Sequence, residues 1–324
     1  MSRRPLAWAL AGGLAVAAPL TADDLAAQRR LYEYDATKPV AAQLTPLRSE
    51  DGVAIYDLLY PSPIAGMVTG FLVAPEGGSL KPPFAGIVFG HWGPGDRSEF
   101  LPEAILYAQA GAVSVLIDYP WVRPEPHRRP QGQGFKGAER DRESWVQAVV
   151  DLRRAFDLLE ARKDVDRARL GYVGHSYGAQ WGAILSAVDK RMKATVLMGG
   201  VPDGECLFNG PDAALRAMRD AAPKEEVEAY WVVNRPYDAI RYIGQAAPVP
   251  LLFQFARHET SFTEADMKRY FEAASAPKEV RWYETGHILN DLRTLADRAG
   301  WLGPRLGLRP LRPVFEKRME AVGR

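Results

Sequence analysis

Residues 169–185 read RLGYVGHSYGAQWGAIL, and this stretch decides the fold. An apolar run typical of a buried strand leads into GHSYG, and an apolar helical pattern follows it. Gly174, Ser176 and Gly178 fit the pattern G-x-S-x-G, in which the chain turns sharply and holds the serine in a strained conformation with its hydroxyl outward. Glycine is needed on both sides because a Cβ there would collide with the neighbouring strand or helix. The stretch therefore predicts a strand, a tight turn that presents Ser176, and a helix.

Short apolar strands alternate with helical stretches over most of the chain. The expected strands cover residues 84–89, 113–118, 169–173, 194–198, 250–255 and 280–283. The expected helices cover residues 100–110, 138–161, 179–188, 264–274 and 289–300. This alternation builds a parallel sheet covered by helices on both faces, so we expect an α/β, mostly parallel, doubly wound fold.

Two further segments modify this plan. Residues 53–60 and 66–74 are β-rich runs joined by PSPIAG, and we expect them to form an antiparallel hairpin at an edge of the sheet. Residues 202–248 are too long for a simple crossover and contain helical pieces. We expect a small helical cap insertion over the carboxyl edge of the sheet; a decorated crossover without a functional role is the alternative.

The first residues resemble a targeting segment. A basic start, Ser2-Arg3-Arg4, is followed by an apolar run that is too short to span a bilayer and that ends near Ala22. We therefore expect a signal peptide over residues 1–22, a single domain over residues 23–324, and a periplasmic or secreted protein. If the segment is not a signal, the protein is cytoplasmic.

Composition excludes several classes of function. The chain has 324 residues with 41 Lys+Arg and 40 Asp+Glu, so its net charge is +1 and no basic stripe predicts a nucleic-acid partner. The single cysteine, Cys206, can form neither an internal disulfide nor a cysteine zinc site. The sequence has no HExxH pattern, no P-loop and no dinucleotide-binding glycine motif, and we expect no cofactor and no metal.

A serine hydroxyl needs a base to accept its proton and a third group to orient that base. His287 follows the last expected strand in VRWYETGH, at the carboxyl edge where open parallel sheets place their sites, and we predict that it is the base. Of the other four histidines, His175 lies beside the serine and His91 lies at the end of a strand. His127 lies in a Pro-rich loop, and His258 lies just past a strand.

The orienting carboxylate is expected in the loop after the preceding strand, which reads ARHETSFTEAD. Glu259 is the first carboxylate after that strand, and we predict that it fills this role. Glu264 and Asp266 remain alternatives, but we expect them to begin a helix, whose N-terminus favours acidic residues.

The negative charge of a tetrahedral intermediate requires preorganised donors. We predict the main-chain amide of Tyr177 as one donor. The second is expected from Trp92 or Gly93 in GHWGPG, where small residues permit close approach of the backbone. The alternative is that HWGPG is only a turn.

Taken with their order along the chain, Ser176, Glu259 and His287 resemble the α/β-hydrolase superfamily. FAGIVFGHWG, DVDRARLGYVGHSYGA, PVPLLFQFA and SAPKEVRWYETGH resemble its dienelactone hydrolase and prolyl-oligopeptidase-like branch, over about residues 53–300. The resemblance implies hydrolysis of an ester or related acyl bond through an acyl-serine, without a cofactor. Dienelactone hydrolases use a cysteine nucleophile and usually an aspartate, so lactone specificity does not carry over.

The sequence is therefore compatible with three functions. The first is a serine carboxylesterase that acts on a small or medium ester. The second is a small peptidase or amidase of the prolyl-oligopeptidase-like branch, which is disfavoured because no β-propeller domain precedes the hydrolase region. The third is a non-catalytic hydrolase fold used for binding.

Overall fold

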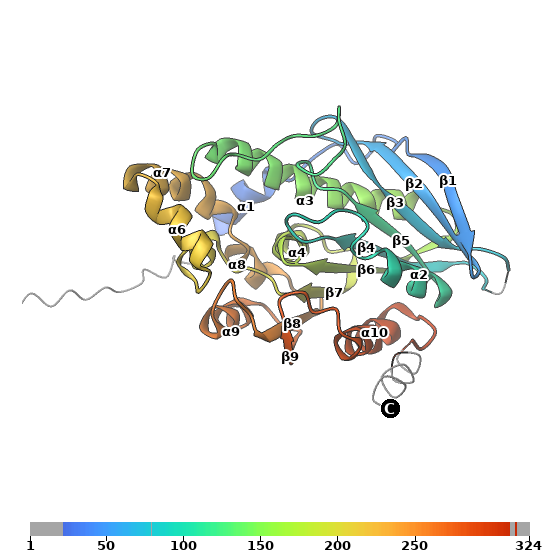
Figure 1. Ribbon diagram of the computed structural model, residues 1–324. Helices are drawn as coiled ribbons and strands as arrows, with labels where there is room; N and C mark the ends of the chain where they lie inside the picture. Colours follow the sequence, from blue (N-terminus) through green and yellow to red (C-terminus); the bar gives the residue numbers. More distant parts are fainter. Residues whose placement is uncertain (1–21, 79, 312–314, 316–324) are drawn as a thin grey trace, which may run out of the picture.

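A sheet of nine strands forms the centre of the molecule (Figure 1), and its strand order is β1-β2-β3-β5-β4-β6-β7-β8-β9. The computed structural model describes residues 22–78, 80–311 and 315. Strands β4 to β9 run parallel, whereas β1, β2 and β3 pair antiparallel with their neighbours. The strands are β1 (Gln43–Glu50), β2 (Val53–Pro61), β3 (Met67–Pro75), β4 (Phe84–Gly90), β5 (Ala112–Ile117), β6 (Val165–His175), β7 (Met192–Met198), β8 (Leu251–His258) and β9 (Lys278–Gly286). The mostly parallel, doubly wound sheet predicted from the sequence is confirmed.

The antiparallel hairpin of β2 and β3 is also confirmed, but its expected place at the sheet edge is wrong. Strand β1 pairs with β2 on the outer side, and β3 pairs with β5 on the inner side. All eight residues of β1 are exposed, and Pro46 lies within it. An edge strand with neither face buried has no alternation of apolar and polar residues, which is why the sequence pattern did not reveal it.

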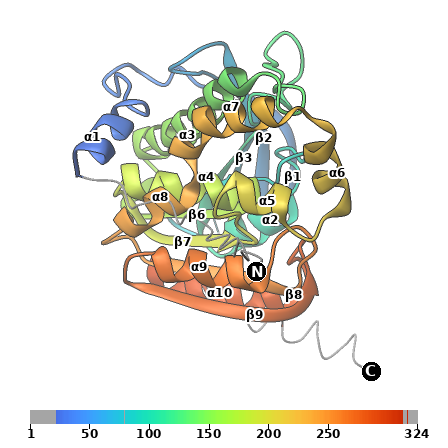
Figure 2. The same ribbon diagram turned by 90° about the vertical axis from the view of Figure 1, so that its left-hand side faces the viewer.

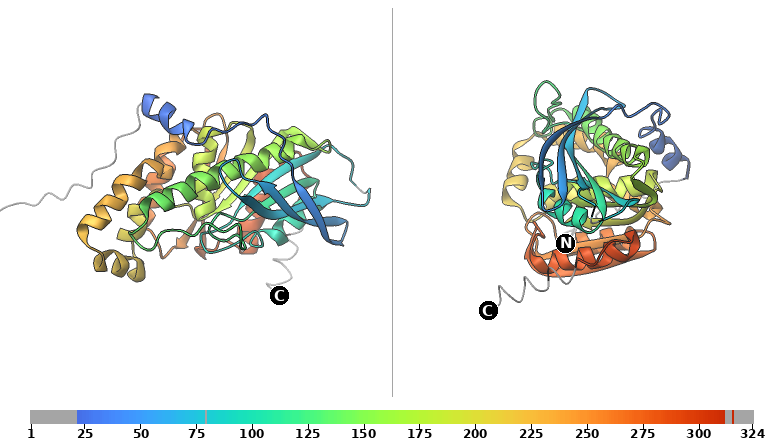
Figure 3. Two further views of the ribbon diagram at one scale, coloured as in Figure 1. Left: turned by 90° about the horizontal axis from the view of Figure 1, so that it is seen from above. Right: turned by 90° about the vertical axis from the view of Figure 1, so that its right-hand side faces the viewer.

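The helices cover both faces of the sheet. They are α1 (Ala22–Arg30), α2 (Leu101–Gln109), α3 (Ala138–Ala161), α4 (Tyr177–Val188), α5 (Gly204–Asn209), α6 (Ala213–Ala221), α7 (Lys224–Asn234), α8 (Ala239–Tyr242), α9 (Glu264–Ala273) and α10 (Leu292–Leu306), with short 3-10 turns at Arg235–Tyr237 and Ile243–Gln245. One apolar core includes residues of α3, α4 and α9, and the second includes residues of α2 and α10. The long helix α3 extends along the sheet in the view from above (Figure 3).

The insertion between β7 and β8 folds as helices α5 to α8. Figures 1 and 2 show α5, α6 and α7 at one end of the molecule, opposite the hairpin of β2 and β3. An aromatic cluster of Phe135, Tyr230 and Trp231 joins the insertion to the loop before α3. The helical pieces expected over residues 202–248 are therefore present; a role as a cap over the substrate stays a prediction.

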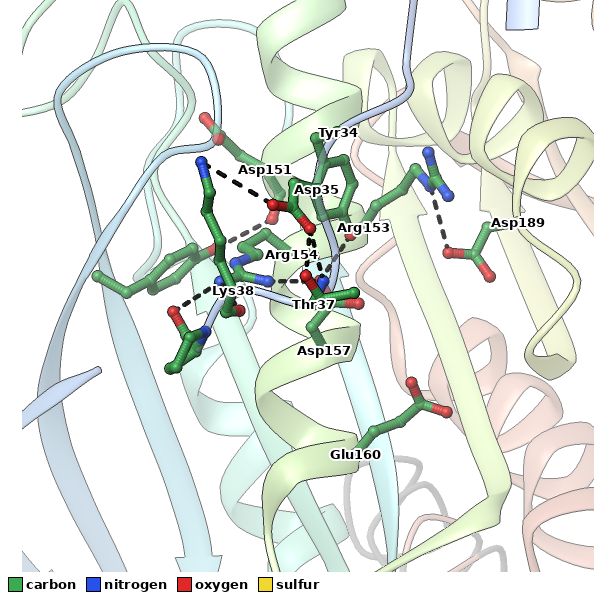
Figure 4. A network of polar contacts seen from close by, with 12 residues as sticks. Tyr34, Asp35, Thr37, Lys38, Asp151, Arg153, Arg154, Asp157, Glu160 and Asp189 are labelled. Carbon is green, nitrogen blue, oxygen red and sulfur yellow. Dashed lines mark hydrogen bonds and ion pairs between the residues drawn. The ribbon is translucent and has the colours of Figure 1, made fainter. Parts of the chain in front are cut away.

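Polar contacts fasten the segment before β1 to helix α3 (Figure 4). The guanidinium group of Arg153 donates to the main-chain oxygen of Tyr32 at 2.5 Å. The guanidinium group of Arg154 donates to the main-chain oxygen of Lys38 at 2.7 Å. The Tyr34 hydroxyl donates to Asp157 at 2.7 Å. These bonds hold a long irregular segment against the fold. The predicted signal segment, residues 1–22, lies outside the described residues except for Ala22, where α1 begins. Within the described part of the chain, no helix is both long and apolar enough to cross a membrane.

Candidate active site

Ser176 lies at the turn between β6 and α4, at the carboxyl edge of the sheet. Its backbone has φ 54° and ψ −110°, a strained conformation for a residue with a Cβ. The Ser176 amide donates to the carbonyl of Met198 at 2.8 Å, which fixes the turn against β7. A Cβ on Gly174 would lie 2.3 Å from the Gly178 oxygen, and a Cβ on Gly178 would lie 2.0 Å from the Gly90 oxygen. Both glycines are therefore required by close backbone approach, as the sequence analysis predicts.

Glu259 and His287 meet at the same edge of the sheet. Glu259 comes directly after β8 and His287 directly after β9, and these strands are parallel neighbours. The Nδ1–H of His287 donates to Oε2 of Glu259 at 2.6 Å. Since Glu259 is ionised in such a pair, Nδ1 carries the proton, and in a neutral ring Nε2 is then the acceptor. This is the tautomer that a general base toward a serine requires.

The environment of Glu259 keeps its side chain ionised. Its side chain is 1% exposed, and burial alone would raise the pKa of the carboxyl group. The hydrogen bond from His287 and the amides of Ser261 and Thr260 outweigh burial, and the pKa of Glu259 is lowered from its ordinary value. Both amides donate to Oε1 at 2.9 Å, so each carboxylate oxygen has a partner.

The imidazole of His287 lies beside the serine turn. Its ring centroid is 5.0 Å from that of His175, the residue before Ser176. A Cβ on Gly199 would lie 3.3 Å from Cε1 of His287, so the glycine after β7 makes room for the ring. Among the described residues, no hydrogen bond joins the Ser176 hydroxyl to His287. Such bonds are often long in proteins without substrate and tighten when substrate binds.

The two predicted sources of the oxyanion site are neighbours. Tyr177 is the first residue of α4, where an amide has no acceptor within its own helix. The amide of Trp92 donates to Oε2 of Glu99 at 2.7 Å, whereas the Gly93 amide has no acceptor among the described residues. The Tyr177 ring packs on Gly93, since a Cβ there would lie 3.3 Å from Cδ2 of the ring. Between the two candidates for the second donor, this arrangement favours Gly93.

Aromatic groups brace the loop that carries Trp92 and Gly93. The indole Nε1 of Trp121 donates to the Gly93 carbonyl at 2.8 Å. His91 accepts the Tyr119 amide at Nε2 and donates from Nδ1 to the Trp92 carbonyl at 2.6 Å. Burial lowers the pKa of His91 to about 4, which agrees with a neutral ring that donates at one nitrogen and accepts at the other.

Sequence reasoning missed one pair at this site. His175 Nδ1 lies 2.5 Å from Oε1 of Glu99, and its Nε2 lies 2.9 Å from the main-chain oxygen of His287. From the sequence, His175 is only the residue beside the serine. The sequence contains no spacing signal for its contact with Glu99, because the two residues are 76 positions apart.

Comparison with known proteins places this fold. The sequence matches no protein-family model and none of the curated proteins. Among solved structures, an acetyl xylan esterase from Paenibacillus sp. R4 superposes with a TM-score of 0.67 at 20% identity, covering 82% of this chain and 87% of that one. Acetyl xylan esterase 1 from Thermoanaerobacterium sp. JW/SL YS485 gives 0.69 at 14% identity, covering 89% and 94%. A prolyl endopeptidase gives 0.58 at 16% identity, covering 81% of this chain and 40% of its own.

These likenesses establish the fold. The chain has the α/β-hydrolase fold that its sequence resembles, with the serine turn, the carboxylate loop and the histidine loop at the carboxyl edge of the sheet. At such low identities the likeness shows the fold alone, and the chemistry must be argued from the residues of this chain.

Proposed function

We propose that this protein is a serine hydrolase that cleaves a carboxylic ester through an acyl-Ser176 intermediate. The observation that carries the proposal is the 2.6 Å hydrogen bond from His287 to the buried Glu259 carboxylate, beside a strained serine turn. An imidazole held in this way presents Nε2 as an acceptor. A serine at a turn of this kind presents its hydroxyl for attack.

In the first half of the reaction, Nε2 of His287 takes the hydroxyl proton while Oγ of Ser176 bonds to the carbonyl carbon of the ester. The carbonyl oxygen becomes an oxyanion, which accepts hydrogen bonds from the main-chain amides of Tyr177 and Gly93. When the intermediate collapses, the bond from carbon to the alkoxy oxygen breaks and His287 returns the proton to the leaving alcohol. Water then attacks the acyl-serine by the same route and releases the acid.

Ser176→Ala tests the proposal on short p-nitrophenyl esters. Removal of the hydroxyl prevents the acyl-enzyme, so we expect turnover to fall to a residual level while the far-UV circular dichroism and the melting temperature remain those of the wild type. Ser49→Ala, at an exposed position of β1, is the matched control and is expected to be fully active. Turnover of the Ser176→Ala protein at the wild-type rate would contradict the proposal.

Matched ester and amide substrates separate the two hydrolase classes. An esterase is expected to cleave a p-nitrophenyl ester much faster than the p-nitroanilide of the same acid, at equal concentrations. A faster reaction with the anilide would favour the peptidase or amidase alternative over the esterase, with the same Ser176 as nucleophile.

A further inference from the structure

A second carboxylate–imidazole pair lies directly beside Ser176 and His287. His175 Nδ1 is 2.5 Å from Oε1 of Glu99, and the two side chains are 2% and 19% exposed. Glu99 belongs to the loop between β4 and α2, whereas His175 is the last residue of β6. The contact therefore joins two loops at the carboxyl edge of the sheet.

Each residue of this pair has a second partner. Oε2 of Glu99 accepts the Trp92 amide at 2.7 Å, and Nε2 of His175 lies 2.9 Å from the main-chain oxygen of His287. A carbonyl oxygen can only accept, so Nε2 of His175 must carry a proton. Nδ1 faces a carboxyl oxygen, so one more proton lies between Nδ1 and Oε1. The pair thus holds one proton more than a neutral imidazole facing a carboxylate.

The pair connects the three segments that the proposed reaction needs. Glu99 holds the main chain at Trp92, next to the Gly93 amide. His175 precedes the nucleophile Ser176 in the turn, and it holds the main chain of the base His287. A chain of four groups, from the Trp92 amide to the His287 carbonyl, therefore spans the donor loop, the serine turn and the base loop.

We propose that Glu99 and His175 are positioning residues that share one proton and fix the distance between the oxyanion donors and the general base. This inference rests on the proposed hydrolase function, because its consequence is a rate. Neither residue touches the reacting atoms in this account. Their effect passes through the main chain of Trp92 and His287, whose placement decides whether nucleophile, base and oxyanion donors are aligned together.

The first test is Glu99→Gln. A carboxamide has one oxygen and one NH2 group, so it can accept the Trp92 amide only if its NH2 group faces Nδ1 of His175. The side chain keeps its size, but the shared proton is lost and the charge-assisted bond to His175 becomes a weaker, longer neutral one, which loosens the connection between the two loops. We expect kcat to fall by about tenfold to a hundredfold with KM nearly unchanged, since a small misplacement of the reacting groups has effects of this size.

The matched control is Glu284→Gln. Glu284 forms a second contact of this kind with His258, but both side chains are exposed, at 74% and 68%. We expect Glu284→Gln to keep the wild-type kcat. Equal kcat values for Glu99→Gln and the wild type would overturn the proposal.

A second readout does not depend on activity. In protein labelled with 15N-histidine, we expect both ring nitrogens of His175 to carry a proton in the wild type and only one in Glu99→Gln, with the resonance assigned from His175→Asn. A neutral His175 in the wild type, with the proton on Glu99, would contradict the imidazolium form. In that case the shared proton must be on Glu99, and protein labelled with 13C-glutamate would give the signal of a carboxylic acid. Absence of both signals would overturn the inference.

A double-mutant cycle tests whether the two residues act as one unit. If they do, Glu99→Gln combined with His175→Asn lowers kcat no further than the more damaging single variant. Multiplication of the two effects would contradict a shared role. Failure of the hydrolase proposal itself would look different: the wild type would have no turnover dependent on Ser176, while the nitrogen spectra would still report on the pair.

Discussion

In the proposed reaction, Glu259 determines which nitrogen of His287 carries the proton. In Glu259→Gln the carboxamide can donate to Nδ1, which stabilises the tautomer whose Nε2–H cannot accept the serine proton. We expect kcat to fall by about 10⁴-fold, the size of effect produced by a wrong tautomer in a serine triad. Steady-state turnover of a p-nitrophenyl ester measures it.

Glu264→Gln is the control for this prediction. Glu264 lies at the start of α9 with an exposed side chain that pairs with Lys268, outside the bond to His287. We expect its kcat to equal that of the wild type. If instead Glu264→Gln lost activity and Glu259→Gln kept it, the carboxylate would have been assigned to the wrong residue.

His91 makes the stability of the protein sensitive to acid. Burial lowers its pKa to about 4, whereas a histidine in an unfolded chain has a pKa of about 6.5. As the pH falls from 6.5 to 4, the unfolded chain binds a proton that the folded protein does not. The free energy of unfolding therefore decreases over this window, by about 3 kcal/mol from this residue.

Urea unfolding of the wild type and of His91→Gln, at several pH values between 4 and 7, isolates this contribution. Glutamine can both donate and accept, but it does not titrate. We expect the free energy of unfolding of the wild type to fall relative to that of His91→Gln as the pH decreases from about 6.5 to about 4. A constant difference would show that His91 binds its proton equally well in both states.

At the scale of elements, a buried ion pair joins α10 to α2. Arg298 donates to both oxygens of Glu103, each at 2.8 Å, and to Oε1 of Gln254 at 2.7 Å. Arg298 is 1% exposed, so loss of its partner leaves a charge without compensation. We expect Glu103→Gln to lower the free energy of unfolding by about 3–5 kcal/mol, as urea denaturation would measure.

Replacing Glu103 and Arg298 together separates the destabilisation caused by an unpaired buried charge from the stabilisation that the ion pair itself contributes. In the variant that combines Glu103→Leu with Arg298→Met, no charge stays buried, and we expect stability above that of Glu103→Gln. A double variant less stable than Glu103→Gln would mean that the bonds of Arg298 to other groups dominate.

The elements that sequence predicts best are those in which one face is buried. The expected helix over residues 138–161 has the bounds of α3, because its apolar residues recur at helical spacing. Glu264 and Asp266 begin α9, where Asp266 forms a capping box with Thr263. Strand β1 was not predicted, because all of its residues are exposed and its sequence therefore shows no alternation of apolar and polar residues.

The insertion between β7 and β8 is tied to the rest of the molecule by aromatic side chains. Trp231 of α7 lies with its ring centroid 5.8 Å from that of Phe135 and 5.7 Å from that of Phe208. We expect Trp231→Ala to cost about 3–5 kcal/mol, as removal of a large buried aromatic side chain does. Hydrogen exchange should then increase first in α5 to α7; an increase confined to α2 and α10 would contradict this view of the interface.

Across the whole molecule, the sequence predicts where along the chain the functional groups occur better than how they meet. Parallel strands bring their carboxyl ends to one edge, so residues after β6, β8 and β9 are expected near each other. The pairing of Glu99 with His175 depends instead on how two loops pack, and no sequence pattern at either residue predicts this contact. The choice between Trp92 and Gly93 likewise depended on the contact of one amide with Glu99.

The central claim is that Ser176 is a nucleophile activated by His287. A fluorophosphonate tests it most directly, because attack by Oγ forms a phosphorus–oxygen bond and expels fluoride, whatever the natural ester is. Mass spectrometry of the digested protein is expected to place the adduct on the peptide that contains Ser176, with much slower labelling in His287→Ala and none in Ser176→Ala. An unlabelled wild type, or an adduct on another residue, would contradict the account.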